Sequence, residues 1–171
     1  MTVTTKITHM TKNISFLTLL LMFCFNSFGQ HLGMTFQAAE KQGITIQHLD
    51  SIYKSALHAD TSQAVFKTDS EQIDVQKAYI KLLQDFGKFL FNHNFKWEKP
   101  TKCFNRIYFN ADGTIDYFLY NFLGKQEDKL SEERQNEFNE LLNQFIKDYK
   151  FNMTSKVKFS QCSPTTYMPK K

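Results

Sequence analysis

The chain has 171 residues, a formal net charge of +4 and 15% aromatic residues. This charge is too small to create a strong field for nucleic acid or anionic lipid, and Arg occurs only at positions 106 and 134. Eighteen Phe and seven Tyr supply enough apolar area for a substantial core, which excludes a largely disordered chain. We therefore expect a globular protein that does not bind nucleic acid.

Residues 1–29 have the pattern of an export signal. Lys6 and Lys12 precede an apolar run over 14–25, and small residues stand at the −3 and −1 positions of a cleavage point. The run is shorter than the roughly 20 residues that span a bilayer. We expect cleavage to leave residues 30–171 as a single periplasmic or extracellular domain without an integral membrane span. Retention of the segment as an N-terminal anchor is the alternative.

The first half of the mature chain shows two helical patterns after a loose lead-in. Residues 30–43 are polar or small and have no clear period. Apolar residues recur at three- and four-residue spacings over 45–57, and a longer amphipathic pattern covers 70–92. The buried stripe of this longer helix is expected to comprise Ile73, Ile80, Leu83, Phe86 or Gly87, and Leu90, with Leu82 and Phe89 widening it.

Two aromatic-rich strand patterns follow, over 104–109 and 114–122. Between them, Asn110-Ala111-Asp112-Gly113 suits a short hairpin loop in which the glycine takes a positive φ. An amphipathic helix is predicted over 131–149, with Glu residues in its first turn, where the helix dipole favours negative charge. The order of these elements predicts a hairpin that is covered by a helix.

The last strand pattern determines the predicted topology. Residues 156–162 alternate in polarity, and the proline that follows ends the pattern, so 164–171 is expected to be a loose tail. A helix between the second and third strands carries the chain back, so an antiparallel sheet places the third strand beside the first. We predict an α+β fold, with two N-terminal helices followed by a ββαβ unit. Its three-stranded antiparallel sheet has order 2-1-3 and is packed by helices.

Residues 97–162 resemble the C-terminal domain of the TonB family. The resemblance rests on the run 105–115 with its Asp-Gly turn, on the helix 131–149 that leads to Lys150-Phe151, and on the final strand. It implies a shared hairpin, helix and last strand. The chain differs from that family in its cleavable-looking signal and in the lack of a Pro-rich spacer, so the resemblance concerns the fold and not energy transduction.

Cys103 and Cys162 are the two cysteines of the mature chain. An oxidising compartment favours a disulfide between them, and the predicted topology brings the start of the first strand near the end of the third. Closing a loop of about 60 residues would stabilise the fold by roughly 4 kcal/mol. Simple alternation does not bring both side chains to one face without a bulge or an early end to the strand. Two buried thiols are the alternative.

Motifs for catalysis and for metal binding do not occur in the sequence. No two histidines of the mature chain have i,i+3 or i,i+4 spacing, and there is no nucleophile elbow, phosphate-binding glycine loop or Cys-x-x-Cys. We therefore predict no catalytic residue, no metal site and no cofactor.

The first functional hypothesis is a non-catalytic interaction module of the bacterial cell envelope. With sheet order 2-1-3, the third strand keeps an open edge to which a segment of an envelope protein or peptide can add a strand. The residues expected to bind this partner are Lys156, Val157, Lys158 and Phe159. The opposing interpretation is that Lys156 and Lys158 are present to prevent edge pairing.

The second hypothesis is a small-ligand carrier or an enzyme with an aromatic pocket between the sheet and the helices. Aromatic residues on both faces of the hairpin strands imply either helices on both faces or a surface that faces a ligand. The candidate pocket residues are Tyr108, Tyr117, Phe118 and Tyr120. Core packing is the alternative interpretation of these rings.

Overall fold

The computed structural model describes residues 31–125 and 130–169. The chain divides into a unit of residues 1–30 and a unit of residues 31–171, and only the second contains described residues. The predicted export signal therefore lies outside the described residues. Within the described ranges, no helix is both long enough and apolar enough to cross a membrane.

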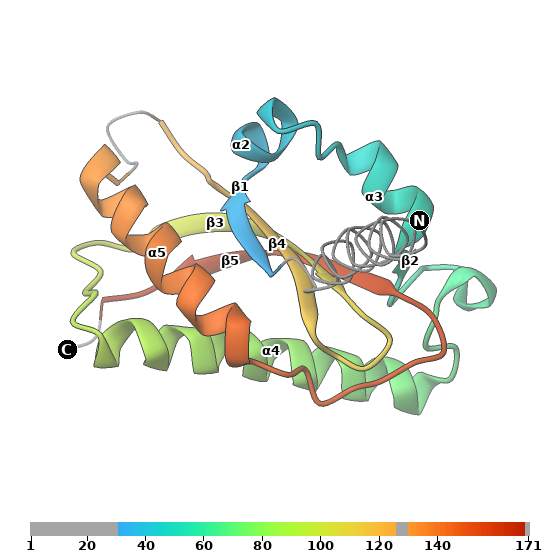
Figure 1. The fold of residues 1–171 in the computed structure, drawn as a ribbon. Coiled ribbons are helices and arrows are strands. Elements are labelled where there is room, and N and C mark those ends of the chain that lie inside the picture. Colours follow the sequence, from blue (N-terminus) through green and yellow to red (C-terminus); the bar gives the residue numbers. More distant parts are fainter. Residues whose placement is uncertain (1–30, 126–129, 170–171) are drawn as a thin grey trace, which may run out of the picture. The chain divides into compact units, whose positions relative to one another are not determined.

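Five strands form one mixed sheet, in the order β1-β4-β3-β5-β2 (Figure 1). They are β1 (Leu32–Thr35), β2 (Lys54–Ser55), β3 (Thr101–Phe109), β4 (Ile115–Phe122) and β5 (Phe159–Tyr167). β3 is antiparallel to β4 and β5, whereas β1 runs parallel to β4 and β2 runs parallel to β5. The predicted three-stranded antiparallel sheet is therefore wrong. Its three strands are neighbours at the centre, and a short parallel strand is added on each side.

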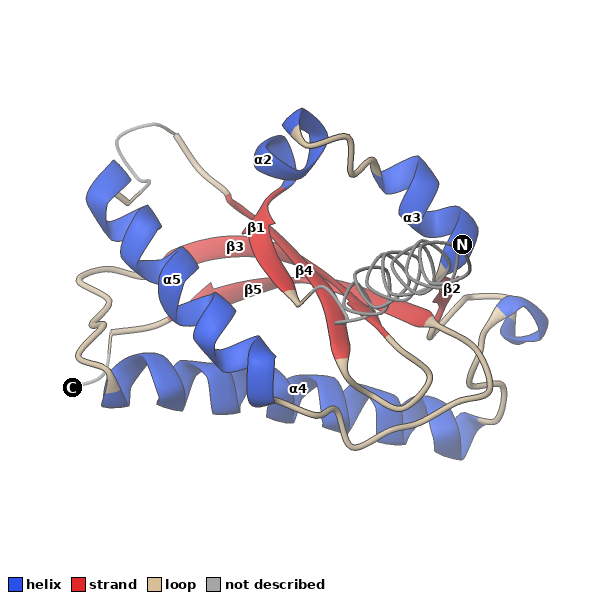
Figure 2. Cartoon of the chain, viewed as in Figure 1, coloured by secondary structure: helices blue, strands red, loops and turns tan. Residues whose placement is uncertain are grey.

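Helices lie on both faces of this sheet (Figure 2). They are α2 (Phe36–Lys41), α3 (Ile46–Ile52), α4 (Asp69–Asn92) and α5 (Glu132–Asp148), with a short 3-10 helix at Thr61–Gln63. α4 and α5 cover one face, and α2 and α3 cover the other. The α+β class is thus confirmed, and two layers of helices account for aromatic side chains on both faces of the hairpin.

Two segments that were predicted to be loose belong to the fold. The lead-in 30–43 contains β1 and α2, which were missed because four and six residues are too few to show a period. The expected tail 164–171 continues β5 as far as Tyr167. Pro164 does not end this strand, because proline is tolerated on an edge strand when its nitrogen faces away from the ladder.

α4 begins and ends close to where its sequence pattern predicts. Thr68 and Glu71 form a capping box, in which each side chain bonds the backbone N–H of the other residue. The helix ends at Asn92, and Asn94 follows with a positive φ of 64°. The hairpin is also confirmed: Asn110 donates its N–H to the carbonyl of Thr114 at 2.8 Å, and Gly113 has a φ of 89°.

The main core lies between the sheet and the helices α4 and α5. Phe86 of α4 is fully buried, and its ring centroid lies 5.0 to 6.0 Å from those of Phe118, Phe138 and Phe145. Aromatic rings in such offset and tilted contacts each bury about 150–250 Å². This cluster fixes α4 and α5 against β4, and it therefore also fixes the position of α4 relative to the neighbouring strands.

A smaller core lies under α2 and α3 on the opposite face, around Met34, Leu49, Tyr53, Tyr108 and Leu119. The ring of Tyr53 meets that of Tyr108 edge-on, with centroids 5.1 Å apart. This core holds the N-terminal helices on the sheet and closes the face that would otherwise expose the tyrosines of β3 and β4.

Candidate binding groove

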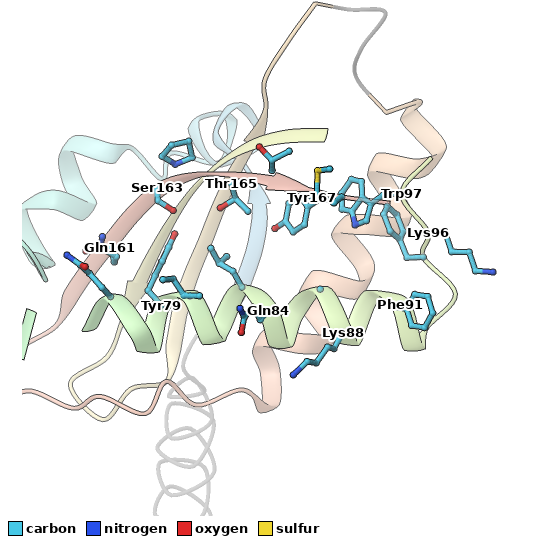
Figure 3. A pocket seen from close by; sticks show the side chains of 18 residues that line it. Tyr79, Gln84, Lys88, Phe91, Lys96, Trp97, Gln161, Ser163, Thr165 and Tyr167 are labelled. Atoms are coloured by element: carbon cyan, nitrogen blue, oxygen red, sulfur yellow. The ribbon is translucent and has the colours of Figure 1, made fainter. Parts of the chain in front are cut away.

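The composition of β5 changes along its length and leaves a gap beneath the strand. Phe159 and Tyr167, at its two ends, are large and buried against the main core. Between them, the side chains that share this face are the smaller polar residues Gln161, Ser163 and Thr165. Because they do not fill the space above α4, a groove of about 1140 Å³ opens between β5 and this helix (Figure 3). The sequence thus produces the groove by placing small polar residues where a closed core needs large apolar ones.

The helix α4 presents a different surface on each of its two flanks. One flank meets α5, where Phe89 packs on Phe145 with ring centroids 5.5 Å apart. The other flank lines the groove with Gln76, Ile80, Leu83, Gly87 and Phe91. These positions recur every three or four residues and therefore share one side of the helix.

The expected burial of Ile73 and Ile80 in α4 is wrong. These residues are 50% and 55% exposed, whereas Phe86 and Leu90 are buried as expected and Val75 is buried in addition. The apolar positions of this helix cover too wide an arc for one face to be buried. That width is a signal in the sequence for a second apolar surface, whereas the prediction assigns all of these positions to one broad buried stripe.

An aromatic stack closes one end of the groove. Trp97 lies almost parallel to Tyr167, with an interplanar angle of 7° and ring centroids 4.6 Å apart. Trp97 also meets Phe95 and Phe138 edge-on, which ties it to the main core. In Figure 3 the two stacked rings lie at the end of the groove nearest to the C-terminus of α4. This wall is therefore rigidly supported from behind.

The outer edge of β5 is open over most of its length. β2 pairs only with Phe159 and Ser160, and Ala56 donates its N–H to the carbonyl of Ser160 at 2.8 Å. Backbone groups alternate in direction along a strand, so Cys162, Pro164 and Thr166 also direct their carbonyls outward. Cys162 and Thr166 direct their N–H groups outward as well. Within the described ranges, no strand pairs with β5 on this side beyond Ser160. The open edge borders the groove directly, because Pro164 and Thr166 line both.

Buried polar groups lie behind the groove, around Asn105. Its Nδ2 donates to Thr165 Oγ1 at 3.1 Å, and the Cys103 thiol donates to its Oδ1 at 3.2 Å. The hydroxyls of Tyr79 and Tyr167 are buried nearby, beside Ser163 and Asn105 respectively, but neither has a partner in hydrogen-bond geometry within the described chain. Burial raises the pKa of both phenols, so both remain protonated.

The thiol behind the groove is not an activated nucleophile. Burial raises the pKa of the Cys103 thiol to about 12, which keeps it protonated and a poor nucleophile. The charged residues that line the groove are Lys88 and Lys96. Among the residues that the structure describes, no three His, Cys, Asp or Glu side chains are grouped so that they could hold a metal ion.

All four of the predicted edge residues lie outside the open edge. Lys156, Val157 and Lys158 precede β5, and Phe159 is its first residue, buried and paired with Phe109. The strand thus begins three residues later than predicted, after a turn in which Ser155 bonds the backbone of Val157.

Lys158 has a structural role instead of facing a partner. Its Nζ donates to Asp116 Oδ2 at 2.9 Å, and the Tyr53 hydroxyl donates to the same oxygen at 2.5 Å. Asp116 lies at an irregularity in the pairing of β3 and β4, where Tyr108 pairs with Tyr117 but Phe109 pairs with Ile115. Burial is the larger cause of the raised pKa of Tyr53, and the hydrogen bond to Asp116 is the second. This cluster joins α3, the hairpin and the start of β5.

The four aromatic residues proposed for a ligand pocket are divided between the two cores. Tyr108 and Tyr117 pack around Tyr53 under α3. Phe118 and Tyr120 lie on the opposite face, buried in the main core. The structure therefore does not bring the four together, and none of them lines the groove.

The predicted disulfide is not formed, and both cysteines are free. Cys103 pairs across the sheet with Thr165, whereas Cys162 pairs with Arg106. The regular register places the two thiols on opposite faces of the sheet, because no bulge interrupts the pairing of β3 with β5. The alternation pattern in the sequence, which puts the two cysteine side chains on opposite faces, therefore indicated the arrangement correctly.

A second cavity of about 550 Å³ lies beside α3 and β2, and its lining includes Asp50, His58, Arg106 and Cys162. The guanidinium of Arg106 is already paired with Asp50, at 2.5 Å. This pair neutralises the charge of Arg106, although Lys54 also lines the cavity. The groove along β5 is larger and borders an open strand edge, so it is the better candidate for a binding site.

Comparisons with protein-family models, with curated proteins and with solved structures find no match for this chain. The resemblance of residues 97–162 to the TonB C-terminal domain stays a prediction.

Proposed function

We propose that this protein is an exported, non-catalytic interaction module of the bacterial cell envelope. In this proposal it binds an extended segment of a partner polypeptide, which adds as a strand along β5. The observation that carries the proposal is the open edge over 161–167, which lies directly beside an uncovered groove. Strand addition uses this combination: backbone hydrogen bonds supply affinity, and pockets for alternate side chains supply specificity.

Pro164 is the main argument against this function, because proline on an edge discourages pairing. It removes only one hydrogen-bonding group, since its carbonyl still faces outward. Cys162 and Thr166 keep both of their outward groups, although the carbonyl of Cys162 also accepts a bond from the Gln161 side chain at 3.3 Å. A partner strand can therefore bond on both sides of the proline. We interpret Pro164 as a limit on self-pairing that still permits a matched partner.

The groove favours a polypeptide over a small ligand by its size and form. Small-molecule sites occupy about 300–1,000 Å³ and enclose most of their ligand. This groove exceeds that range at about 1140 Å³ and follows the strand edge from Gln161 to Met168. A small-ligand carrier therefore remains the secondary candidate.

Replacing Thr166 by proline tests whether the outward N–H of this residue bonds a partner strand. Thr166→Pro removes an outward donor without touching the ladder between β5 and β3, whereas Thr166→Ala shortens the same side chain and keeps the donor. We expect wild type and Thr166→Ala to capture the same stoichiometric partner from the native envelope fraction, and Thr166→Pro to lose it. Equal capture by the proline variant, with an unchanged circular dichroism spectrum, would exclude this edge.

Hydrogen exchange of the captured complex provides an independent measurement. The amides of Cys162 and Thr166 are the outward donors of the open edge, so a partner strand slows their exchange. The amide of Ser160 is the internal reference, because β2 already pairs with that residue. Unchanged exchange at both positions would show that the partner binds elsewhere.

A further inference from the structure

Gly87 is placed where the fold itself does not require a glycine. It lies in the interior of α4, and glycine is the least favourable residue after proline in a helix interior. A Cβ added at this position would meet no atom within 4 Å. Packing within the described residues therefore does not explain Gly87, and its position in the wall of the groove links it to what the groove could bind.

The missing side chain creates a notch in the wall of the groove. Leu83 and Phe91 lie one turn before and one turn after Gly87, and all three line the groove. Ile80 lies on the same flank and is 55% exposed. A large apolar side chain that enters from the open edge can rest on the helix backbone at Gly87, between the neighbouring side chains.

The helix flank and the open strand edge have similar lengths. Residues 161–167 of β5 extend over about 20 Å at roughly 3.3 Å per residue. The flank of α4 from residue 76 to residue 91 covers about 23 Å at about 1.5 Å per residue. Figure 3 shows β5 running along α4 above the groove, so a strand added to β5 can follow the helix over a similar length, with every second side chain on the side of the helix.

The charge of the groove has one sign. Lys88 and Lys96 line it, and no Asp or Glu among the residues that the structure describes does so. Lys88 shares Asp85 with Lys81, and its Nζ lies 3.8 Å from that carboxylate, so the pairing is incomplete. In an added strand, the side chains between those that face α4 point away from these lysines, so the lysines act on them over a distance and not by direct contact. Within a screening length of about 8–10 Å, carboxylates on a bound segment would be attracted and amines repelled.

We propose that the segment bound along β5 is an extended polypeptide with large apolar side chains at alternate positions and carboxylates between them. One of the apolar side chains fits into the notch at Gly87. This inference rests on the proposed strand addition and specifies the chemistry of its partner.

The experiment measures fluorescence anisotropy of the purified chain with labelled, end-blocked peptides of about eight residues. The first peptide alternates Leu and Glu, the second alternates Leu and Lys, and the third contains the residues of the first in two blocks. We expect the first to bind at least tenfold more tightly than either of the others. Equal binding of the Lys peptide or of the block peptide would overturn the proposed chemistry, as would no binding by any of the three.

Gly87→Ala separates binding from folding. Alanine favours the helix and meets no neighbour, so the urea midpoint of unfolding is expected to rise. The added methyl partly fills the notch, so affinity for the Leu/Glu peptide is expected to fall about tenfold. Asn136→Ala is the matched control, because Asn136 is exposed on α5 and away from the groove. It raises the midpoint and leaves affinity unchanged, and the same result with Gly87→Ala would overturn the role of the notch.

The Thr166→Pro variant keeps this inference distinct from the function on which it rests. If Thr166→Pro abolishes capture of the envelope partner while the Leu/Glu peptide does not bind, strand addition holds and the proposed chemistry is wrong. If Thr166→Pro does not affect peptide binding, strand addition itself fails. If a second copy of the chain occupies the groove, light scattering will show a dimer that Gly87→Ala weakens, and the partner proposal is overturned.

Discussion

The backbone groups at the β1 edge and at the β5 edge of the sheet are satisfied in different ways. At the β1 edge, Gly33 donates its N–H to Asn143 Oδ1 at 2.8 Å, and Asn143 Nδ2 donates back to the Gly33 carbonyl at 2.8 Å. A side chain of α5 thus takes the place of a neighbouring strand. At the β5 edge, β2 covers two residues and the rest stays open. One edge is closed to pairing and the other is available for it.

The closed edge shows what edge protection requires in this fold. A Cβ on Gly33 would lie 2.7 Å from Leu142 Cγ, so the close approach of α5 depends on the absence of a side chain there. A glycine, an asparagine and the packing of α5 together protect this edge. At β5 the corresponding protection is the single Pro164. The contrast supports a binding role for β5, because an exposed strand edge is otherwise a liability.

Opening the β1 edge is expected to have the largest effect on stability. Asn143→Ala removes both bonds to Gly33 and leaves a backbone donor and acceptor unpaired beneath α5. Unpaired buried groups cost about 1–3 kcal/mol each, so we expect the free energy of unfolding to fall by about 3 kcal/mol. Urea denaturation measures this, with Asn136→Ala on the same helix as the control. A loss below about 1 kcal/mol would show that the stability of the β1 edge does not depend on these two hydrogen bonds.

Restoring the missing N–H donor at Pro164 is expected to have an intermediate effect, on the affinity for the partner. Pro164→Thr adds an outward N–H, which completes the set of groups on the open edge. A hydrogen bond contributes about 0.5–1.5 kcal/mol net, so partner affinity should rise about two- to tenfold. The expected cost is greater self-association, which sedimentation velocity detects. An unchanged affinity together with unchanged self-association would show that this edge takes no strand.

The elements that the sequence predicts well are long and strongly periodic. α4 and α5 cover 24 and 17 residues, and the hairpin around Gly113 has a turn whose chemistry is local. β1 and β2 have four and two residues, too short for any period to appear. Their parallel pairing depends on contacts between residues distant in the chain, which a local pattern does not contain.

The third strand of the predicted sheet is present in the structure, but it begins later than predicted, so the four residues proposed for partner binding do not lie on its open edge. Alternation around Val157 and Phe159 indicated a strand, whereas the bond from Lys158 to Asp116 and the pairing of Phe159 with Phe109 determine where the strand begins. The groove was not predictable, because α4 and β5 meet only after folding. The local signals were the wide apolar arc of α4 and Gly87, since a glycine in a helix interior requires a reason.

The smallest expected effect is the slowing of thiol labelling by a bound partner. This measurement compares Cys162 at the open edge with Cys103 in the core of the same sheet. Cys162 is exposed on β5, whereas Cys103 is buried and has a pKa raised to about 12. Under native conditions at pH 8, iodoacetamide should label Cys162 alone, and Cys103 should react only after unfolding. A bound strand would lie beside Cys162 and slow its labelling without protecting it fully, because its side chain is on the face opposite α4. Failure of both thiols to react in unfolded, unreduced protein would reveal a disulfide and contradict the register of β3 and β5.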